Sequence, residues 1–157
     1  MRKEHDMDTN SKKALFTTLK ETWHKMDCQF NSYAKSRGLN FPTVLILQLL
    51  HDSTEVYTQK DICEKLGLPK QLVFSIIKPF WEQGYVELRE AKDRRNKDVI
   101  ITEKGMAYAV SVLKPLEDAE ESAWANFSDD EVVTFVRTMG EYVEAFGYAL
   151  DRQQDIK

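Results

Sequence analysis

The sequence predicts a mainly α-helical fold with a small two-stranded β wing. Along most of the 157 residues, apolar side chains recur every three or four positions, which is the period of an amphipathic helix. Residues 85–89 and 97–101 are instead rich in β-branched and apolar side chains and are typical of strands. We therefore expect a helical protein that carries one β-hairpin.

The first third of the chain predicts two helices. The first begins near Ser11, and Gly38 ends it. Its apolar stripe consists of Leu15, Leu19, Trp23, Met26, Phe30 and Tyr33. Pro42 suits the first turn of a second helix, which extends to about His51.

Two short helices joined by a tight turn come next. Thr58 can cap the segment TQKDICEKLG, and Gly67 breaks it. Pro69 then begins a helix that Gly84 ends, which completes a helix-turn-helix pattern. The two strand-like segments follow, joined by the charged stretch EAKDRRN. Residues 41–102 therefore predict a winged helix-turn-helix region.

The last third predicts two more helices. One extends from Thr102 to about Phe127, and Pro115 should kink it. Ser128 and Glu131 have the spacing of a capping box at the start of the other. Its apolar side comprises Val132, Phe135, Val136, Met139, Val143, Phe146 and Leu150. We find no internal repeat and no long linker, so we expect a single domain over residues 1–157.

The composition is typical of a soluble globular protein, with 42% hydrophobic and 31% charged residues. The longest apolar run, residues 44–50, is too short to cross a bilayer. The start, MRKEHDMDTN, has no apolar core of a signal peptide, and two cysteines are too few for a disulfide framework. We expect a cytoplasmic protein that is not associated with a membrane.

The charge distribution is uneven along the chain. The net charge is −4, which by itself argues against nucleic-acid binding. Residues 58–104 nevertheless hold ten Lys or Arg and eight Asp or Glu, against twelve and eighteen in the remainder. A mildly basic segment in an acidic chain suits a protein that presents one face to phosphates.

The second helix of the helix-turn-helix carries the candidate DNA-reading residues. In such motifs this helix enters the major groove with its N-terminal end first. Its inward side should hold Leu72, Val73, Ile76, Ile77 and Phe80, and its outward side Lys70, Gln71, Phe74, Ser75 and Lys78. Gln71 can read adenine, the lysines can reach phosphate or guanine, and Phe74 could pack on a thymine methyl group. The alternative is that these five residues form an ordinary solvated helix face.

This order of elements resembles the MarR family of bacterial regulators. The match covers most of the chain and is strongest over residues 59–105. Its most specific pieces are Asp93-Arg94-Arg95 at the wing tip, Gly84-Tyr85-Val86 before the wing and Ile101-Thr102-Glu103-Lys104-Gly105 after it. A helix-turn-helix pattern occurs in many families, but the wing and the Ile-Thr-Glu-Lys-Gly segment that follow it here make the resemblance specific.

The resemblance implies a transcription regulator, a repressor, that works as a homodimer. In that family the terminal helices intertwine, here residues 11–37 and 103–152. Each subunit presents one winged helix-turn-helix to half of a pseudo-palindromic double-stranded DNA site. Many members release DNA in response to small ligands such as phenolic compounds, to oxidants or to metals.

The wing carries four basic residues and one bracing carboxylate. A narrow minor groove attracts inserted arginine, and the resemblance assigns that role to Arg95 with Asp93 as its salt-bridge partner. Arg94 would then meet phosphate, and Lys92 and Lys97 add positive charge. The alternative is a solvated charged hairpin tip.

The reading helix departs from the family in three places. The position of Ser75 often carries arginine in the family, and that of Phe74 often carries a small hydroxyl residue. Pro79 is also unusual, because proline removes a hydrogen bond to the carbonyl of Ser75. These departures bear on the base contacts rather than on the fold.

The long terminal helices predict a dimer interface. Their apolar stripes can pack across a two-fold axis instead of within one subunit. The candidates for the interface and its supporting frame are Trp23, Phe30, Phe135, Met139, Tyr142 and Phe146. An ordinary core within one chain is the alternative.

Sensing residues are harder to choose. Cys28 could be a redox sensor with His24 one turn before it, although a thiol beside apolar residues is more often plain packing. His24, Cys28 and Glu21 are also spaced for metal ligation, but we expect no bound metal, and Cys63 suits the helix-turn-helix core. An effector pocket between the dimer helices and the winged region could be lined by Trp23, Met26, Tyr33 and Tyr57, although such aromatic residues are more often core.

The sequence contains no motif of an enzyme. There is no glycine-rich phosphate loop, no HExxH and no paired Cys-x-x-Cys, so we expect neither catalytic residues nor a cofactor. The remaining alternative is a winged-helix module, or an anti-repressor, that binds a protein instead of DNA. This alternative is compatible with an apolar Phe74 on the outward face, with Pro79 inside the helix and with the net charge of −4.

Overall fold

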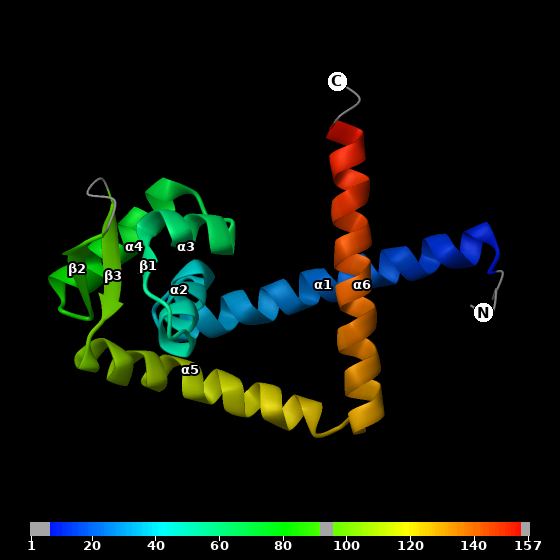
Figure 1. Ribbon diagram of the computed structural model, residues 1–157. Coiled ribbons are helices and arrows are strands. Elements are labelled where there is room, and N and C mark those ends of the chain that lie inside the picture. The colour runs from blue at the N-terminus through cyan, green and yellow to red at the C-terminus, as the bar shows by residue number, and fades with distance from the viewer. Residues whose placement is uncertain (1–6, 92–95, 155–157) are drawn as a thin grey trace. The chain divides into compact units, whose positions relative to one another are not determined.

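The computed structural model describes residues 7–91 and 96–154. The described elements are, in chain order, two helices, a short strand, the two helices of a helix-turn-helix, two strands and two long helices (Figure 1). The chain divides into two units, residues 1–114 and 115–157, and each is considered by itself. No helix among the described residues has the length and apolar content needed to span a bilayer.

Helices α1 (Thr9–Ser36) and α2 (Phe41–Asp52) begin the first unit. The Asp8 carboxylate caps α1 by accepting hydrogen bonds from two backbone N–H groups of its first turn. Asn40 caps α2 in the same way, with Pro42 inside the first turn, as expected of proline. The Phe30 ring stacks on the Phe41 ring at 4.9 Å, which packs the end of α1 against α2.

Helices α3 (Gln59–Leu66) and α4 (Lys70–Glu82) form the helix-turn-helix. Gly67 ends α3 in the left-handed conformation with φ 63°, and its N–H bonds to the Cys63 carbonyl. Gly84, with φ 74°, ends α4, and the Tyr85 N–H closes that end on the Phe80 carbonyl at 2.8 Å. The glycines therefore stand where the chain needs a positive φ.

The sheet has three antiparallel strands in the order β1-β3-β2. Strands β2 (Val86–Glu90) and β3 (Lys97–Ile101) make the expected hairpin, with Leu88 opposite Val99. The two-residue strand β1 (Tyr57–Thr58) pairs with the other edge of β3. The expectation of a two-stranded sheet therefore missed β1, because two residues carry no readable alternation.

The core of the first unit lies between these helices and the sheet. Its members are apolar side chains that expose less than a tenth of their surface. They include Ala34, Val44, Ile46, Leu47, Ile62, Val73, Ile77, Val86, Val99, Ala109 and Leu113. At roughly 2 kcal/mol for each large side chain removed from water, this set stabilises the unit enough to hold α4 in a fixed orientation.

Helix α5 (Glu103–Trp124) is fastened to the end of α4. The Thr102 backbone N–H donates to the Tyr85 carbonyl at 3.0 Å, and the Thr102 hydroxyl donates to the Gly84 carbonyl at 2.7 Å. The Lys104 ammonium donates to the Gln83 carbonyl at 2.7 Å. A Cβ atom on Gly105 would lie 1.9 Å from the Tyr85 carbonyl oxygen, so only glycine fits there. These contacts give a physical reason for the Thr-Glu-Lys-Gly sequence after the wing.

An aromatic cluster packs beside this junction. The Tyr85 and Tyr108 rings stack at 4.5 Å, and Phe80 meets both edge-on. Burial, and then the neighbouring Tyr85, raise the pKa of Tyr108. The cluster joins α4, the first residues of the wing and α5 in one apolar contact.

The second unit contains the end of α5 and helix α6 (Asp129–Gln154). Glu131 and Ser128 form the expected capping box at the start of α6. Trp124 meets Phe127 and Phe135 edge-on, at 6.1 and 5.8 Å between ring centroids. Helix α5 continues through Pro115, where the two units divide.

Replacing Gly105 with alanine should destabilise the protein by about 3 kcal/mol, because the added methyl group meets backbone that cannot move without breaking the junction. Urea denaturation at one fixed protein concentration measures this change. Ala107→Gly, at an exposed position of the same helix, is the control and should cost only about 1 kcal/mol through helix propensity. Equal losses in the two variants would show that the close approach at Gly105 is unimportant.

Candidate nucleic-acid interface

Helix α4 presents an exposed face of mixed character. Its inward side chains Val73, Ile76, Ile77 and Phe80 are buried, and Leu72 is half-buried. The candidate reading residues Lys70, Gln71, Phe74, Ser75 and Lys78 are all exposed. Burial of the inward side fixes the rotation of the helix, so these five side chains face outward together.

A capping box stabilises the start of α3, the helix that supports α4. The Thr58 hydroxyl accepts from the Asp61 N–H, and the Asp61 carboxylate accepts from the Thr58 N–H at 2.8 Å. The hydrogen bonds from the backbone and then the hydroxyl of Thr58 lower the pKa of Asp61. These bonds hold the first turn of α3 in place. Because α4 follows α3 after a tight turn, they also help to fix the orientation of α4.

The polar groups on α4 differ in their availability. The Ser75 hydroxyl donates to the Leu72 carbonyl at 2.8 Å, so its proton is used within the helix and its oxygen stays open as an acceptor. Lys78 lies 3.9 Å from the Glu82 carboxylate, an exposed pair that contributes little stability. Because this pair is loose, the Lys78 ammonium can exchange the carboxylate for a phosphate.

Lysines from the helix-turn-helix and the sheet border a common hollow. This cavity of about 460 Å³ is lined by Gln59, Lys60, Cys63, Glu64, Lys70, Asn96 and Lys97. The structure therefore brings Lys70 of α4 and Lys97 of β3 to one surface, although they are far apart in the sequence. Lys60, which the sequence analysis did not select, belongs to the same group, although its ammonium lies 3.5 Å from Glu64.

Four candidate wing residues, Lys92, Asp93, Arg94 and Arg95, lie outside the described residues, and their roles stay predictions. On the adjoining strand, Arg89 donates to the Glu87 carboxylate at 2.8 Å. This exposed pair holds the arginine along the strand. The sequence analysis passed over Arg89, because an ion pair two residues apart is visible only when both lie on one face of a strand.

The candidate effector residues have separate surroundings. Tyr33 donates to the Val112 carbonyl and lies beneath the Arg37 guanidinium, which ties α1 to α5. Trp23 is half-buried and Met26 is exposed, both on α1. Tyr57 is buried on β1 and bonds instead to residues of the α2–α3 region.

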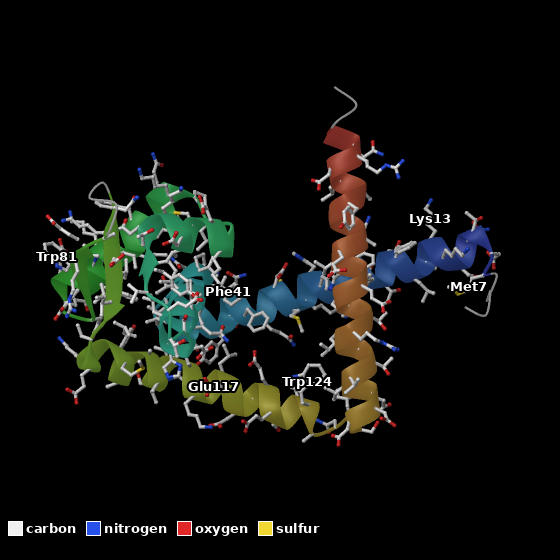
Figure 2. All side chains as sticks on the ribbon, viewed as in Figure 1. Met7, Lys13, Phe41, Trp81, Glu117 and Trp124 are labelled. Carbon is white, nitrogen blue, oxygen red and sulfur yellow. The ribbon has the colours of Figure 1, made fainter. Side chains whose placement is uncertain are left out.

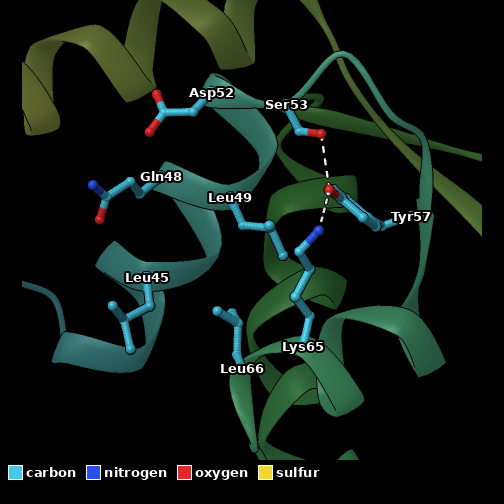
Figure 3. Close-up of a pocket in the computed structure, with 8 residues that line it drawn as sticks. All are labelled: Leu45, Gln48, Leu49, Asp52, Ser53, Tyr57, Lys65 and Leu66. Atoms are coloured by element: carbon cyan, nitrogen blue, oxygen red, sulfur yellow. Dashed lines mark hydrogen bonds between the residues drawn. The ribbon is translucent and has the colours of Figure 1, made fainter. Parts of the chain in front are cut away.

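Tyr57 lines an open cavity of about 400 Å³ between α2 and α3 (Figure 3). Leu45, Leu49 and Leu66 supply its apolar wall, and Gln48 and Asp52 stand at its rim. The Lys65 ammonium and the Ser53 hydroxyl both approach the Tyr57 hydroxyl, each at 2.9 Å. The hydrogen bond with Tyr57 raises the pKa of Lys65, and the Glu55 carboxylate lies 3.8 Å from its ammonium. Trp23, Met26 and Tyr33 are not among the residues that line this cavity.

The two cysteines are free thiols in different settings. Cys28 is exposed on α1, with its sulfur 4.0 Å from His24 Nε2. Cys63 is half-buried on α3. Within the described parts of the chain, no group of three His, Cys, Asp or Glu side chains is arranged to hold a metal ion.

Together, the helix-turn-helix, the antiparallel wing and the exposed face of α4 define a winged helix-turn-helix protein. Residues 37–96 match the family model described as MarR family. The chain is therefore similar to the MarR family of transcriptional regulators over its helix-turn-helix and wing.

Three relatives illustrate the similarity. The transcriptional repressor YetL of Bacillus subtilis is 24% identical over 132 residues, which cover 83% of this chain and 79% of that protein. A MarR family regulator from Neisseria meningitidis is 25% identical with a TM-score of 0.75, over 88% of this chain and 98% of that one. Staphylococcus aureus MepR in a DNA-binding conformation shares the fold, with a TM-score of 0.70 at 14% identity, over 84% of this chain and 98% of that one.

The capping box generates a pH-dependent prediction. Asp61→Ala should lower stability by about 1 kcal/mol at pH 7, because the Thr58 N–H loses its carboxylate acceptor, although the Thr58 hydroxyl still caps α3. The folded protein lowers the pKa of Asp61, so the benefit of the wild-type residue is complete above the ordinary carboxyl pKa of about 4. The benefit should then disappear as the pH falls through the lower value of the folded state.

Urea titrations of wild type and variant from pH 7 to pH 3 measure the difference. Glu64→Ala is the control, since its exposed pair with Lys60 should be worth less than about 0.5 kcal/mol. A difference between wild type and Asp61→Ala that stays constant down to pH 3 would contradict the role given to the carboxylate.

Proposed function

We propose that this protein is a cytoplasmic repressor that binds a pseudo-palindromic operator as a homodimer and releases it in response to a signal. The observation that carries the proposal is the outward face of α4, which is exposed on a rigid helix-turn-helix beside a lysine-lined hollow. A helix of this kind fits the width of the major groove. One relative is named as a transcriptional repressor, and the structure of another was solved in a DNA-binding conformation, which supports the proposed repressor function.

The dimer is supported by apolar side chains that the described chain leaves uncovered. On α6, Val136, Val143 and Phe146 expose 50 to 59% of their surface, although they share one side of the helix. On α1, Leu15, Phe16 and Met26 are exposed to a similar degree. Monomeric proteins rarely leave such continuous apolar faces in water. A second copy of the chain would bury them and set two α4 helices about one DNA turn apart.

Release by a signal is supported by the cavity beside Tyr57. It lies between α2 and α3, so a bound molecule would contact α3 and could shift α4, which packs against α3. Its apolar wall of three leucines suits a small organic molecule. Cys28 is exposed enough to react with an oxidant, and oxidation there is the second route to release.

A protein-binding module is the second candidate function. The side chains of Phe74 and Trp81 expose 55% and 52% of their surface on the same helix, and Trp81 extends away from the first unit (Figure 2). Aromatic side chains of this kind anchor protein interfaces as well. Salt dependence separates the two functions, because DNA binding weakens steeply with added salt through counterion release.

The deciding experiment is selection of duplexes from a random pool by the purified protein at two salt concentrations, followed by sequencing. We expect an inverted repeat with half-sites about one turn apart, held less tightly at the higher salt. Absence of any enriched repeat would overturn the operator proposal and favour the protein-binding module.

Two substitutions test the assignment of the interface on the selected duplex. Arg95→Ala should weaken binding by a factor of ten or more through loss of the minor-groove contact, and Asp93→Ala should weaken it less, because it only braces the arginine. Fluorescence anisotropy with labelled duplex measures both. Arg152→Ala, at the far end of α6, removes the same charge and should leave the affinity nearly unchanged. Normal affinity of the Arg95 variant would overturn the assignment of the wing.

The dimer face on α6 can be tested with a pair of substitutions. Val143→Asp places a charge on the apolar side and should shift the protein from dimer to monomer, because an unpaired charge is costly in an apolar interface. Tyr148→Asp places the same charge on the opposite side, where the side chain is 74% exposed, and should leave the dimer intact. Light scattering after size-exclusion chromatography measures the mass. Equal masses for the two variants would mean that this face of α6 is not the interface.

A further inference from the structure

Phe74 is an apolar side chain among polar side chains that can contact bases. It lies in the first half of α4, the half that carries base contacts in helix-turn-helix proteins, and 55% of its surface is exposed. Gln71, Ser75 and Lys78 surround it on the same face and are exposed too. A large apolar group in this position costs solubility and adds nothing to the core, so its role must concern what lies against the face.

We propose that Phe74 makes the operator depend on a thymine methyl group, a specificity that rests on the DNA-binding function proposed above. The methyl group of thymine is the apolar group that the four base pairs offer on the floor of the major groove. The other groups there are donors and acceptors, which a phenyl ring would strip of water without replacing their hydrogen bonds. Phe74 therefore favours thymine and disfavours the other bases at the position it covers.

The neighbouring Gln71 sharpens the expected half-site. Three residues of helix advance about 4.5 Å along the axis, close to the 3.4 Å rise of a base-pair step. Gln71 and Phe74 therefore address adjacent or overlapping base pairs. The Gln71 side-chain amide can bind adenine with its oxygen as acceptor and its NH2 group as donor, so adenine and thymine should stand together in each half-site.

Charge on the same face favours DNA over a protein as the occupant. Lys70 precedes Phe74 by one turn and Lys78 follows it by one turn, so the phenyl ring lies between two exposed cations. This arrangement places the ring over bases while the ammonium groups reach phosphates. A protein partner would have to bring acidic groups on both sides of an apolar pocket.

Trp81 provides an internal comparison. It is an equally exposed aromatic residue on α4, seven positions and therefore about 10.5 Å further along the helix. At that distance it lies near the C-terminal end, away from the bases that Phe74 would cover. If the two rings instead formed one protein-binding stripe, their substitutions would have similar effects.

The test replaces thymine with deoxyuridine, which removes only the methyl group. The probe is the duplex that the protein itself selects from a random pool, with each thymine of a half-site replaced in turn. One replacement should lower the affinity of the wild-type protein by about fourfold, the value expected for one buried methyl group. The Phe74→Ala variant should bind more weakly overall and should no longer distinguish the two duplexes.

Two further variants keep the test decisive. Trp81→Ala should retain the fourfold preference for thymine, and Phe74→Leu should retain most of it, because leucine still offers an apolar contact. A preference for thymine that survives in Phe74→Ala, or the lack of any thymine at which deoxyuridine matters, would overturn the proposal while DNA binding stands. Failure of the wild-type protein to select any duplex would instead overturn the DNA-binding function itself, and the thymine proposal with it.

Discussion

The Tyr85 carbonyl is the point at which the three functional parts of the first unit are joined. It follows the last turn of α4, it precedes the first strand of the wing, and it accepts a hydrogen bond from the Thr102 backbone N–H at the start of α5. Gly105 lets the next helix come against this carbonyl, since any side chain would overlap it. Because Tyr85 lies between the end of α4 and the first strand of the wing, its contacts with α5 support both.

That junction explains why a small sheet can hold a stable wing. Hairpins of two strands are marginal in water, and β2 and β3 have five residues each. Here β1 adds a third strand, and the aromatic cluster of Phe80, Tyr85 and Tyr108 covers the base. The hairpin is thus supported at the end that meets the helices.

The sequence predicted the helices well, because their signals are local. Capping residues such as Thr58 and Asn40, glycines at positive φ and stripes of apolar residues each mark a boundary without knowledge of the fold. The short strand β1 was missed because its pairing with β3 depends on residues some forty positions away. The grouping of Lys60 with Lys70 and Lys97 was missed for the same reason, since these residues come from separate elements. The cavity beside Tyr57 is lined within residues 45–66, but it depends on how α2 and α3 pack, which no local pattern shows.

Helix α4 separates its two tasks by side. Val73, Ile76, Ile77 and Phe80 hold the fold, while Phe74, Ser75 and Lys78 between them are exposed. Substitutions on the outer side therefore change the free energy of unfolding much less than substitutions in the core. A lineage can exchange a residue such as Phe74 and acquire a new binding sequence without first passing through an unstable protein. The departures from the family pattern on this helix fall on that exposed side, so duplicated copies of such a regulator could diverge quickly toward different genes.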